Sequence, residues 1–297
     1  MKKLNIAIIG LGNIGSYLFK FLNDNKKILT EKNNCLPIIK YVSAKSKKRK
    51  RGIKIKKNQW VDNYLNITRF KDVDLIIELI GGAEGPAKKL VFNALKNKKH
   101  VITANKALIG KYGDTLAKIA EKNRVNLEFE AAVCGGVPII RSLKEGLIAN
   151  KISKIYGIFN GTSNYILSSM DKQNKSFEEV LSDAQKMGYA EANPSADLNG
   201  DDVSSKLKIL SSLCFNSFLN NNIYVEGIKN IDKTDIDNAN KLGYKIKLLG
   251  FAELFNKKVY QRVHPTLIKK GSYVARIDGV LNAVIIDGKP VGQSTIQ

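Results

Sequence analysis

The sequence predicts a doubly wound parallel α/β domain followed by an α+β domain whose sheet is mostly antiparallel. Three observations support this prediction. The chain has 297 residues, which is enough for two domains with separate cores. Short apolar, β-branched runs alternate with helical patterns up to about residue 130, and after Gly135-Gly136 this alternation stops. We therefore predict a first domain over residues 1–134 and a second over residues 135–297.

In the first domain, continuous apolar runs predict buried parallel strands, and apolar residues at helical spacing predict the helices between them. We expect strands at 4–9, 37–42, 73–80, 101–103 and 125–130, and helices at 16–23, 88–97 and 112–123. Because crossovers between parallel strands have one hand, the carboxyl ends of these strands lie along one edge, where ligands bind.

In the second domain, the pattern predicts helices and longer, half-exposed strands. We expect helices at 138–147, 165–170, 177–187 and 201–214, and strands at 152–159, 223–227, 252–265 and 275–287. A turn at Gly288-Lys289-Pro290 then leads to residues 291–297, where the chain ends without a helix or a polar tail. Such an ending is typical of a truncated chain.

The net charge of +22 suggests a nucleic-acid partner, but the kind of basic residue argues against one. Only 7 of the 49 basic residues are Arg, and the 42 Lys stand beside 29 Asn and 34 Ile, which is typical of AT-rich codon drift. Surfaces that read nucleic acids more often use Arg and exposed aromatic residues. However, 11 basic residues and no acidic residue lie between Lys32 and Val61, so drift alone does not explain this segment.

The cysteines and the hydropathy pattern exclude several classes of protein. Cys35, Cys134 and Cys214 are far apart, which excludes a zinc ribbon and a disulfide framework and favours a reducing compartment. No apolar run approaches the roughly 18 residues of a membrane span. We therefore predict a cytoplasmic protein without a membrane partner. His100 and His264 have no ligand-spaced partners, and we assign them no role.

Gly10-Leu11-Gly12-Asn13-Ile14-Gly15 directly follows the first expected strand and opens the first helix. In this context, the spacing of the three glycines is typical of a Rossmann-type dinucleotide-binding turn. Glycine allows the backbone to approach a pyrophosphate, which the helix N-terminus attracts. We predict that Gly10, Gly12, Asn13, Ile14 and Gly15 bind the cofactor. The alternative is a strand–helix turn with a purely structural role.

The residues after the second expected strand indicate which dinucleotide binds. NAD-binding domains place an acidic residue there to bind the ribose, but this chain has none between Glu31 and Asp62. Instead, basic residues crowd residues 45–51, and we predict that Lys45 and Arg49 bind the 2′-phosphate of NADP(H). The sequence therefore predicts NADP(H) in preference to NAD(H). The alternative is a solvated, mobile lysine loop.

Four further segments stand at the ends of expected elements: Thr103-Ala104-Asn105-Lys106, residues 130–138, Asn160-Gly161-Thr162-Ser163-Asn164-Tyr165, and residues 188–206. In order and in content they resemble the homoserine dehydrogenase family, and the resemblance covers nearly the whole chain. It implies NAD(P)H-dependent interconversion of L-aspartate 4-semialdehyde and L-homoserine, on the route to threonine, methionine and isoleucine. It also implies that the second domain catalyses the reaction and forms a homodimer.

The resemblance implies a role for individual residues as well. Lys206 matches the general acid/base, Asp202 one helical turn earlier would orient it, and Lys106 matches a second active-site lysine. Lys106 and Thr103 also stand at the edge where the cofactor is expected. In the oxidation of homoserine, Lys206 must be neutral to accept the hydroxyl proton, so that direction should have an alkaline pH optimum. The substrate's ammonium group would be bound by Glu191 and Asp197, beside Thr162 and Tyr165. In isolation, the spacing of Asp202 and Lys206 is that of an ordinary surface salt bridge.

A monovalent cation, Na⁺ or K⁺, is also implied, with Glu130 and the backbone carbonyls of Val133, Gly135 and Val137 as its ligands. The intervening Cys134 is expected to be a small buried residue and not a nucleophile.

The chain departs from the family in two ways. Asn193 replaces an Asp of many members, and members continue past Gln297, many of them with a regulatory domain. We therefore expect no feedback control by threonine on this chain. Two alternatives remain: another amino-acid dehydrogenase of the same plan, and a basic nucleic-acid-binding protein with a vestigial Rossmann domain.

Overall fold

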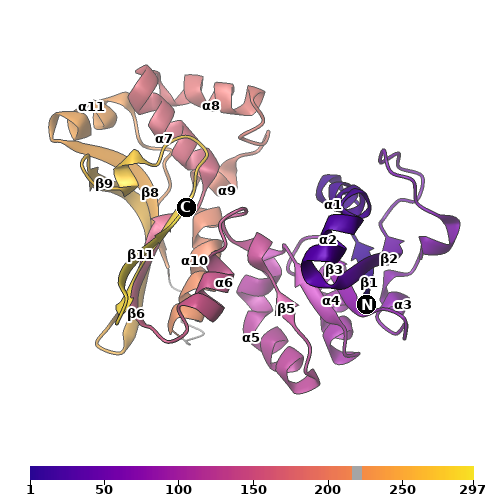
Figure 1. Ribbon diagram of the computed structural model, residues 1–297. Coiled ribbons are helices and arrows are strands. Elements are labelled where there is room, and N and C mark those ends of the chain that lie inside the picture. The colour runs from indigo at the N-terminus through magenta and orange to yellow at the C-terminus, as the bar shows by residue number, and fades with distance from the viewer. Residues whose placement is uncertain (216–222) are drawn as a thin grey trace. The chain divides into compact units, whose positions relative to one another are not determined.

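The computed structural model describes residues 1–215 and 223–297. The chain divides into two compact units, Met1–Ala132 and Val133–Gln297 (Figure 1). The first unit contains a five-stranded sheet and the second a six-stranded sheet. The predicted fold class, a Rossmann-type parallel domain followed by an α+β domain, is confirmed.

The first unit is a parallel sheet with the strand order β2-β1-β3-β4-β5. The order reverses between β1 and β3, which makes the carboxyl end of β1 the expected ligand position. Right-handed crossovers place α1 on one face and α4 and α5 on the other. The elements are β1 (Lys2–Ile9), α1 (Asn13–Asp24), α2 (Lys26–Asn33), β2 (Cys35–Ser43), α3 (Tyr64–Ile67), β3 (Leu75–Glu78), α4 (Pro86–Lys96), β4 (His100–Thr103), α5 (Lys106–Asn123) and β5 (Leu127–Glu128).

The second unit is a sheet with the order β11-β10-β6-β8-β9-β7, in which β7 and β9 are parallel and the other neighbours antiparallel. Its helices are α6 (Ile139–Arg141), α7 (Gly161–Gln173), α8 (Phe177–Lys186), α9 (Ser195–Leu198), α10 (Asp201–Phe215) and α11 (Lys233–Lys241). Its strands are β6 (Lys151–Ile158), β7 (Tyr224–Val225), β8 (Tyr244–Phe255), β9 (Lys258–Lys269), β10 (Ala283–Lys289) and β11 (Gly292–Ile296).

The ring of Phe159 packs directly on the second sheet, on the face that α10 contacts. A Cβ atom at Gly250 would lie 2.7 Å from a ring carbon of Phe159, and one at Gly157 would lie 2.9 Å from the ring and 2.0 Å from the carbonyl oxygen of Ala283. The two glycines therefore leave the space that the ring occupies. Phe159 is fully buried, so its backbone carbonyl is held in a fixed place at the end of β6.

Some predicted elements differ from those observed. The single strand expected at 252–265 is in fact parts of β8 and β9, which form a hairpin that turns at Asn256 and Lys257. Both turn residues have positive φ, 48° and 63°, as a tight hairpin requires, but no glycine marks the turn in the sequence. Of two other expected elements, a strand is shorter than predicted and a helix is divided into two parts. The strand expected at 275–287 begins at Ala283, because Val274 and Ile277 fold over the sheet instead. The helix expected at 138–147 is α6 followed by a π-helical turn over Ser142–Gly146.

A buried lysine joins β8 to α7 and to the loop before β10. Lys247 is 1% exposed, and its Nζ donates to Asn164 Oδ1 at 3.0 Å, to the carbonyl of Ile277 at 2.6 Å and to Asp278 Oδ1 at 2.8 Å. Burial lowers the pKa of Lys247. Burial acts to raise the pKa of Asp278, but hydrogen bonds from Lys247 and Lys172 outweigh it, and that pKa is lowered.

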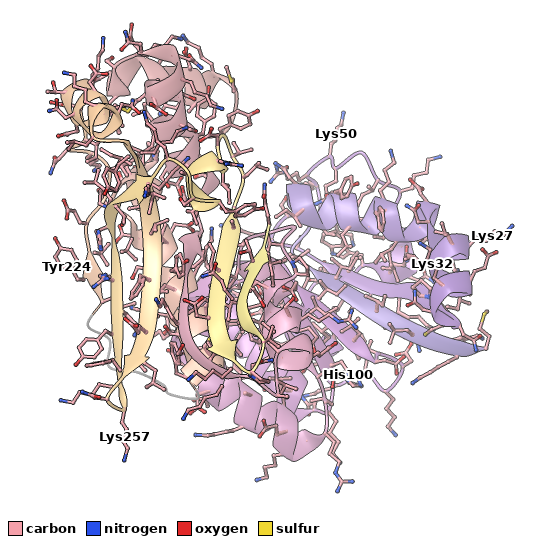
Figure 2. All side chains as sticks on the ribbon, turned by 60° about the vertical axis from the view of Figure 1, so that its left-hand side comes forward. Lys27, Lys32, Lys50, His100, Tyr224 and Lys257 are labelled. Carbon is pink, nitrogen blue, oxygen red and sulfur yellow. The ribbon has the colours of Figure 1, made fainter. Side chains whose placement is uncertain are left out.

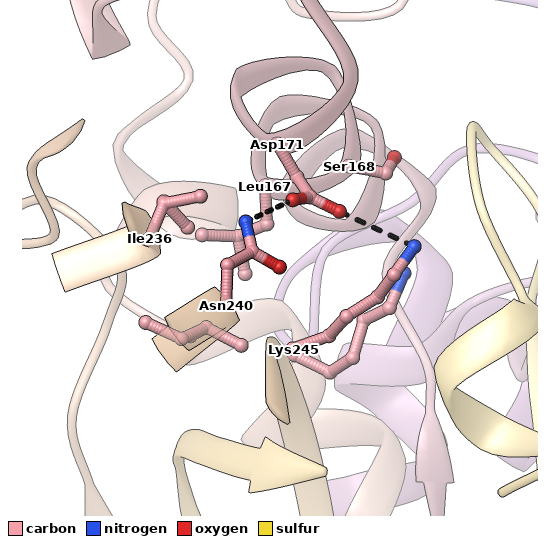
Figure 3. Close-up of a pocket in the computed structure, with 8 residues that line it drawn as sticks. Leu167, Ser168, Asp171, Ile236, Asn240 and Lys245 are labelled. Atoms are coloured by element: carbon pink, nitrogen blue, oxygen red, sulfur yellow. Dashed lines mark hydrogen bonds and ion pairs between the residues drawn. The ribbon is translucent and has the colours of Figure 1, made fainter. Parts of the chain in front are cut away.

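Next to this network, Lys245 Nζ lies 3.2 Å from Asp171 Oδ2, and Asn240 Nδ2 donates to Asp171 Oδ1 at 2.6 Å (Figure 3). The space that these side chains line has a volume of only about 10 Å³, room for about one water molecule. This polar cluster is therefore a structural network and not a ligand site.

Replacement of the buried lysine should destabilise the second unit. Lys247→Ala removes the donor to Asn164 Oδ1 and one of the two donors to the Ile277 carbonyl, together with the ion pair to Asp278, a loss of about 3 kcal/mol. The melting temperature in calorimetry should fall by roughly 6–12 °C. The matched control is Lys172→Ala, which removes an exposed lysine 2.9 Å from Asp278 and should change it little. Equal effects of the two variants would contradict this interpretation.

Candidate active site

In the glycine turn between β1 and α1, two glycines have no space for a side chain, and the third does. A Cβ atom at Gly10, where φ is 103°, would lie 2.4 Å from the backbone of Leu79, and one at Gly15 would lie 2.0 Å from the carbonyl oxygen of Gly10. At Gly12, by contrast, no described atom outside Gly12 and its two neighbours in the chain lies within 4 Å of the Cβ position. The packing of the turn therefore explains Gly10 and Gly15, whereas at Gly12 a glycine leaves room for a ligand next to the start of α1.

A pocket of about 420 Å³ lies beside this turn, within the first unit. Its other wall is the basic loop, which we define as residues 44–56, between β2 and the short 3₁₀ helix Lys57–Gln59. Figure 2 shows Lys50 extending outward from this loop. The residues that line the pocket are Leu11, Gly12, Asn13, Ser16, Tyr17, Lys20, Arg49, Lys50, Arg51, Gly52 and Ile53.

The pocket contains part of the predicted cofactor site. Gly12, Asn13 and Arg49 line it, and Lys45 is exposed on the same loop but is not a lining residue. Tyr17 and Lys20 also line the pocket but were not among the predicted cofactor residues. Because these residues follow Asn13 at helical spacing, that spacing could have identified the face of α1 to which they belong.

Buried polar residues join the ends of β3 and β4, where Thr103 and Lys106 were expected to meet the cofactor. Thr103 is fully buried, and its hydroxyl donates to Glu78 Oε2 at 2.5 Å and accepts from the Asn105 amide at 3.0 Å. The other oxygen of Glu78 accepts from the amides of Ile80 and Gly81 at 2.7 and 3.0 Å. The Thr103 hydroxyl is thus engaged within the protein.

Asn105 completes this arrangement. Its Nδ2 donates to the carbonyl of Gly82 at 2.8 Å, and its Oδ1 accepts from the Leu108 amide at 3.1 Å and so caps α5. Lys106 is the first residue of α5, directly after this cap. Glu78 was not predicted as a functional residue, although a carboxylate just before Gly81-Gly82 at a strand end was a visible signal.

In the second unit, Lys206 and Asp202 form a buried pair on α10. Lys206 Nζ lies 2.7 Å from Asp202 Oδ2, and it donates to the carbonyl oxygen of Phe159 at 2.6 Å. The two side chains are 14% and 5% exposed, which distinguishes the pair from an ordinary surface salt bridge. A charge pair buried this deeply requires further hydrogen bonds to offset its desolvation.

Asn160 supplies such hydrogen bonds. Its Nδ2 donates to Asp202 Oδ2 at 2.9 Å and to Asp197 Oδ1 at 2.7 Å, and its Oδ1 accepts from the Ser163 amide at 2.7 Å, which caps α7. The structure therefore brings the predicted residues Lys206, Asp202 and Asp197 together. Asn160 itself was not among the predicted site residues, although an Asn at a strand–helix junction is a typical N-cap.

Of the remaining predicted substrate residues, Thr162 and Tyr165 lie on α7, and Glu191 lies in the segment that follows α8. Thr162 Oγ1 donates to the carbonyl oxygen of Tyr189 at 2.7 Å, and the rings of Tyr165 and Tyr189 lie 5.1 Å apart. Glu191 is exposed two residues further along. Thr162 and Tyr165 thus hold the segment that carries Glu191.

Cys134 is buried, with φ of 47°, and burial raises the pKa of its thiol to about 12. The charge of Lys206 acts to lower this pKa and that of Asp202 to raise it, but both effects are smaller than that of burial. Neutral thiols are poor nucleophiles, so the structure agrees with a small buried residue here.

The predicted cation ligands fall in both units: Glu130 in the first, and Val133, Gly135 and Val137 in the second. The cation site therefore stays a prediction. Within residues 1–215 and 223–297, no group of three or more His, Cys, Asp or Glu side chains is placed to hold a metal ion.

The chain matches two family profiles in sequence order. Residues 10–130 match the profile described as "Homoserine dehydrogenase, NAD binding domain", and residues 138–297 match the one described as "Homoserine dehydrogenase". The chain belongs to the homoserine dehydrogenase family. The resemblance inferred from its motifs is confirmed, and it is an oxidoreductase with an NAD-binding Rossmann domain.

Other members of the family match the chain along its length. The homoserine dehydrogenase of Neisseria gonorrhoeae is 42% identical over 295 residues, which are 99% of this chain and 67% of that protein. The crystal structure of the Thiobacillus denitrificans enzyme matches with a TM-score of 0.92 at 39% identity, over all of this chain and 68% of that one. A hyperthermophilic archaeal homoserine dehydrogenase in complex with NADPH has the same fold, with a TM-score of 0.81 at 21% identity, over 99% and 91% of the two chains.

Like the sequence, the structure gives no indication of a membrane span. None of the helices in residues 1–215 and 223–297 has the length and apolar character needed to cross a bilayer.

The three cysteines of the chain should react very differently with iodoacetamide. Cys134 is buried, and Cys35 and Cys214 are half-buried. Desolvation raises the pKa of Cys134 and Cys214 to about 12, so both thiols stay neutral at pH 8.5. Mass spectrometry of the native protein at pH 8.5 should show one label per chain, on Cys35, and three labels after denaturation. Labelling of native Cys134 as fast as Cys35 would show that its thiol is activated.

Proposed function

We propose that the chain interconverts L-aspartate 4-semialdehyde and L-homoserine, prefers NADP(H) to NAD(H), and uses Lys206 as the general acid/base. The observation that supports this most directly is the buried set of Lys206, Asp202, Asn160 and Asp197. A lysine whose position is fixed by a carboxylate and a carbonyl oxygen is suited to transfer a proton at one defined place.

Lys206 has three N–H donors as an ammonium group. In the part of the chain that the structure describes, two of them are directed to Asp202 Oδ2 and the Phe159 carbonyl, so one remains for the substrate's aldehyde oxygen. The nicotinamide, when bound, supplies the hydride. As the aldehyde carbon is reduced, Lys206 Nζ gives its proton to the developing alkoxide. In the reverse direction, the neutral amine takes the proton of the homoserine hydroxyl.

The carboxylates near Lys206 have two roles: one orients the lysine, and the others bind the substrate's ammonium group. Asp202 orients Lys206, and Asn160 holds Asp202 and Asp197 in a fixed relation. Asp197 uses one oxygen, Oδ1, for Asn160, and we propose that its other oxygen binds the substrate's ammonium group together with Glu191. Thr162 and Tyr165 would keep Glu191 in place through their contacts with Tyr189.

The first unit fits a dinucleotide. The open position at Gly12 leaves room for the pyrophosphate, beside Gly10, Asn13, Ile14 and Gly15. The pocket of about 420 Å³ is large enough for part of such a cofactor and has Arg49 in its wall. Arg49, with Lys45 on the same loop, would bind the 2′-phosphate, and this fold holds NADPH in the hyperthermophilic archaeal enzyme.

The other proposals rest on the family resemblance. Residues 1–134 would bind the cofactor, and residues 135–297 would catalyse the reaction and form a homodimer. Lys106 would help to position the substrate's carbonyl group, Thr103 would contribute to the cofactor site, and Glu130, Val133, Gly135 and Val137 would hold Na⁺ or K⁺. The enzyme would act in the cytoplasm, in the synthesis of threonine, methionine and isoleucine.

The role of Lys206 can be tested by substitution. Lys206→Ala should lower kcat at least ~100-fold, the lower limit for the loss of a general acid/base, while NADPH still binds. The matched control is Lys208→Ala, on the same helix but outside the buried set, which should keep its turnover within a few-fold. Turnover that survives Lys206→Ala would refute the proposed role.

The cofactor preference can be tested by titration. NADPH should bind at least ~10-fold more tightly than NADH at low ionic strength, since only NADPH offers a 2′-phosphate to the basic loop. The difference should shrink as salt is added, because the charges on the loop are exposed and therefore screened. Equal or tighter binding of NADH would contradict the preference.

A further inference from the structure

Arg51 joins the basic loop to the glycine turn. Its Nε donates to the carbonyl of Leu11, within the glycine turn, at 3.0 Å. Its Nη1 donates to the carbonyl of Arg49 at 2.8 Å, and its Nη2 donates to the carbonyl of Ser46. All three nitrogens of one guanidinium group are thus bonded to backbone carbonyls. Two of these carbonyls belong to the basic loop and the third belongs to the turn 40 residues away.

A fixed aromatic surface supports this guanidinium group. Its Cζ lies 5.6 Å from the ring centroid of Trp60, where Lys47 Nζ also approaches to 5.8 Å. Trp60 Nε1 donates to Asp62 Oδ1 at 2.7 Å, and the backbone of Trp60 forms a bridge with Val42 at the end of β2. Trp60 therefore holds Arg51 against the sheet by a cation–π contact.

Arg51 differs in this respect from the two basic residues before it. All three line the pocket, but Arg51 is half-buried and bonded to the backbone, whereas Arg49 and Lys50 are exposed. Figure 2 shows Lys50 extending outward. The loop also holds several positive charges and no acidic residue, so electrostatic repulsion favours its expansion. Three hydrogen bonds from one planar group oppose that expansion.

We propose that Arg51 is a positioning residue that determines cofactor preference. It holds the basic loop against the glycine turn, and Arg49 and Lys50, placed by it at the pocket, recognise the 2′-phosphate of NADP(H). This inference rests on the proposed preference for NADP(H). It adds Lys50, which lines the pocket, to Arg49 and Lys45 as a residue that binds the phosphate, and it assigns the shape of the site to Arg51.

The test uses the full chain and three variants. Arg51→Lys keeps the charge, but a single ammonium nitrogen cannot span three carbonyls. Arg49→Gln removes a charge and keeps the backbone carbonyl that Arg51 binds. Lys54→Gln is the matched control, since it removes a charge from the same loop at an exposed residue outside the pocket lining. The readouts are the Kd values for NADPH and NADH and the emission of Trp60, which is the only tryptophan in the sequence.

Arg51→Lys should raise the Kd for NADPH by roughly tenfold, leave that for NADH within about twofold, and shift the emission of Trp60 before any cofactor is added. Arg49→Gln should raise the Kd for NADPH by a similar factor without that shift. Lys54→Gln should change neither quantity appreciably.

Three results with Arg51→Lys would overturn the inference. They are an unchanged Kd for NADPH, an equal rise for NADPH and NADH, and a rise for NADPH with unchanged Trp60 emission, which would mean that Arg51 binds the phosphate directly. Equal binding of NADPH and NADH by the unsubstituted chain is a different outcome. It would contradict the proposed cofactor preference itself, whatever the variants do.

Discussion

The candidate active site depends on the side-chain amide of Asn160. Two carboxylates, Asp197 and Asp202, come from α9 and α10, and the same amide nitrogen donates to both. The amide oxygen caps α7 at Ser163, so the end of β6 and the starts of three helices meet at one side chain. Buried carboxylates are stable only when hydrogen bonds and an opposite charge compensate them. Asn160 supplies hydrogen bonds to both carboxylates, and Lys206 supplies the opposite charge beside Asp202. Removal of either side chain would leave a carboxylate without part of this compensation.

The sequence predicts most accurately those features that depend on neighbouring residues. The glycine turn follows from local backbone requirements at Gly10 and Gly15 together with the strand and helix on either side. The pairing of Asp202 with Lys206 follows from helical spacing, and the family resemblance gave it a function. The β8–β9 hairpin was not predicted, because its turn residues Asn256 and Lys257 have positive φ and no glycine marks the turn in the sequence.

Features that depend on distant residues were not predictable in this way. Arg51 binds a carbonyl 40 residues earlier, and Glu78 binds a hydroxyl 25 residues later. Arg51 binds backbone atoms, and every residue has these, so no sequence pattern reports the contact. Asn160 lies in a motif that was recognised, but its links to Asp197 and Asp202 arise only when α9 and α10 pack beside β6. Contacts of this kind follow from the fold and not from spacing.

The packing of Phe159 connects the site to the sheet in a further way. The ring lies where side chains at Gly157 and Gly250 would otherwise stand, and the backbone carbonyl of Phe159 accepts a hydrogen bond from Lys206 Nζ. A local opening that released this carbonyl would have to remove the ring from the sheet and disrupt the pairing of β6 with β8 and β10. Lys206, the proposed general acid/base, therefore belongs to the same cooperative folding unit as the sheet. Fluctuations that expose loops at low energetic cost leave it in place, and its geometry persists as long as the second unit stays folded.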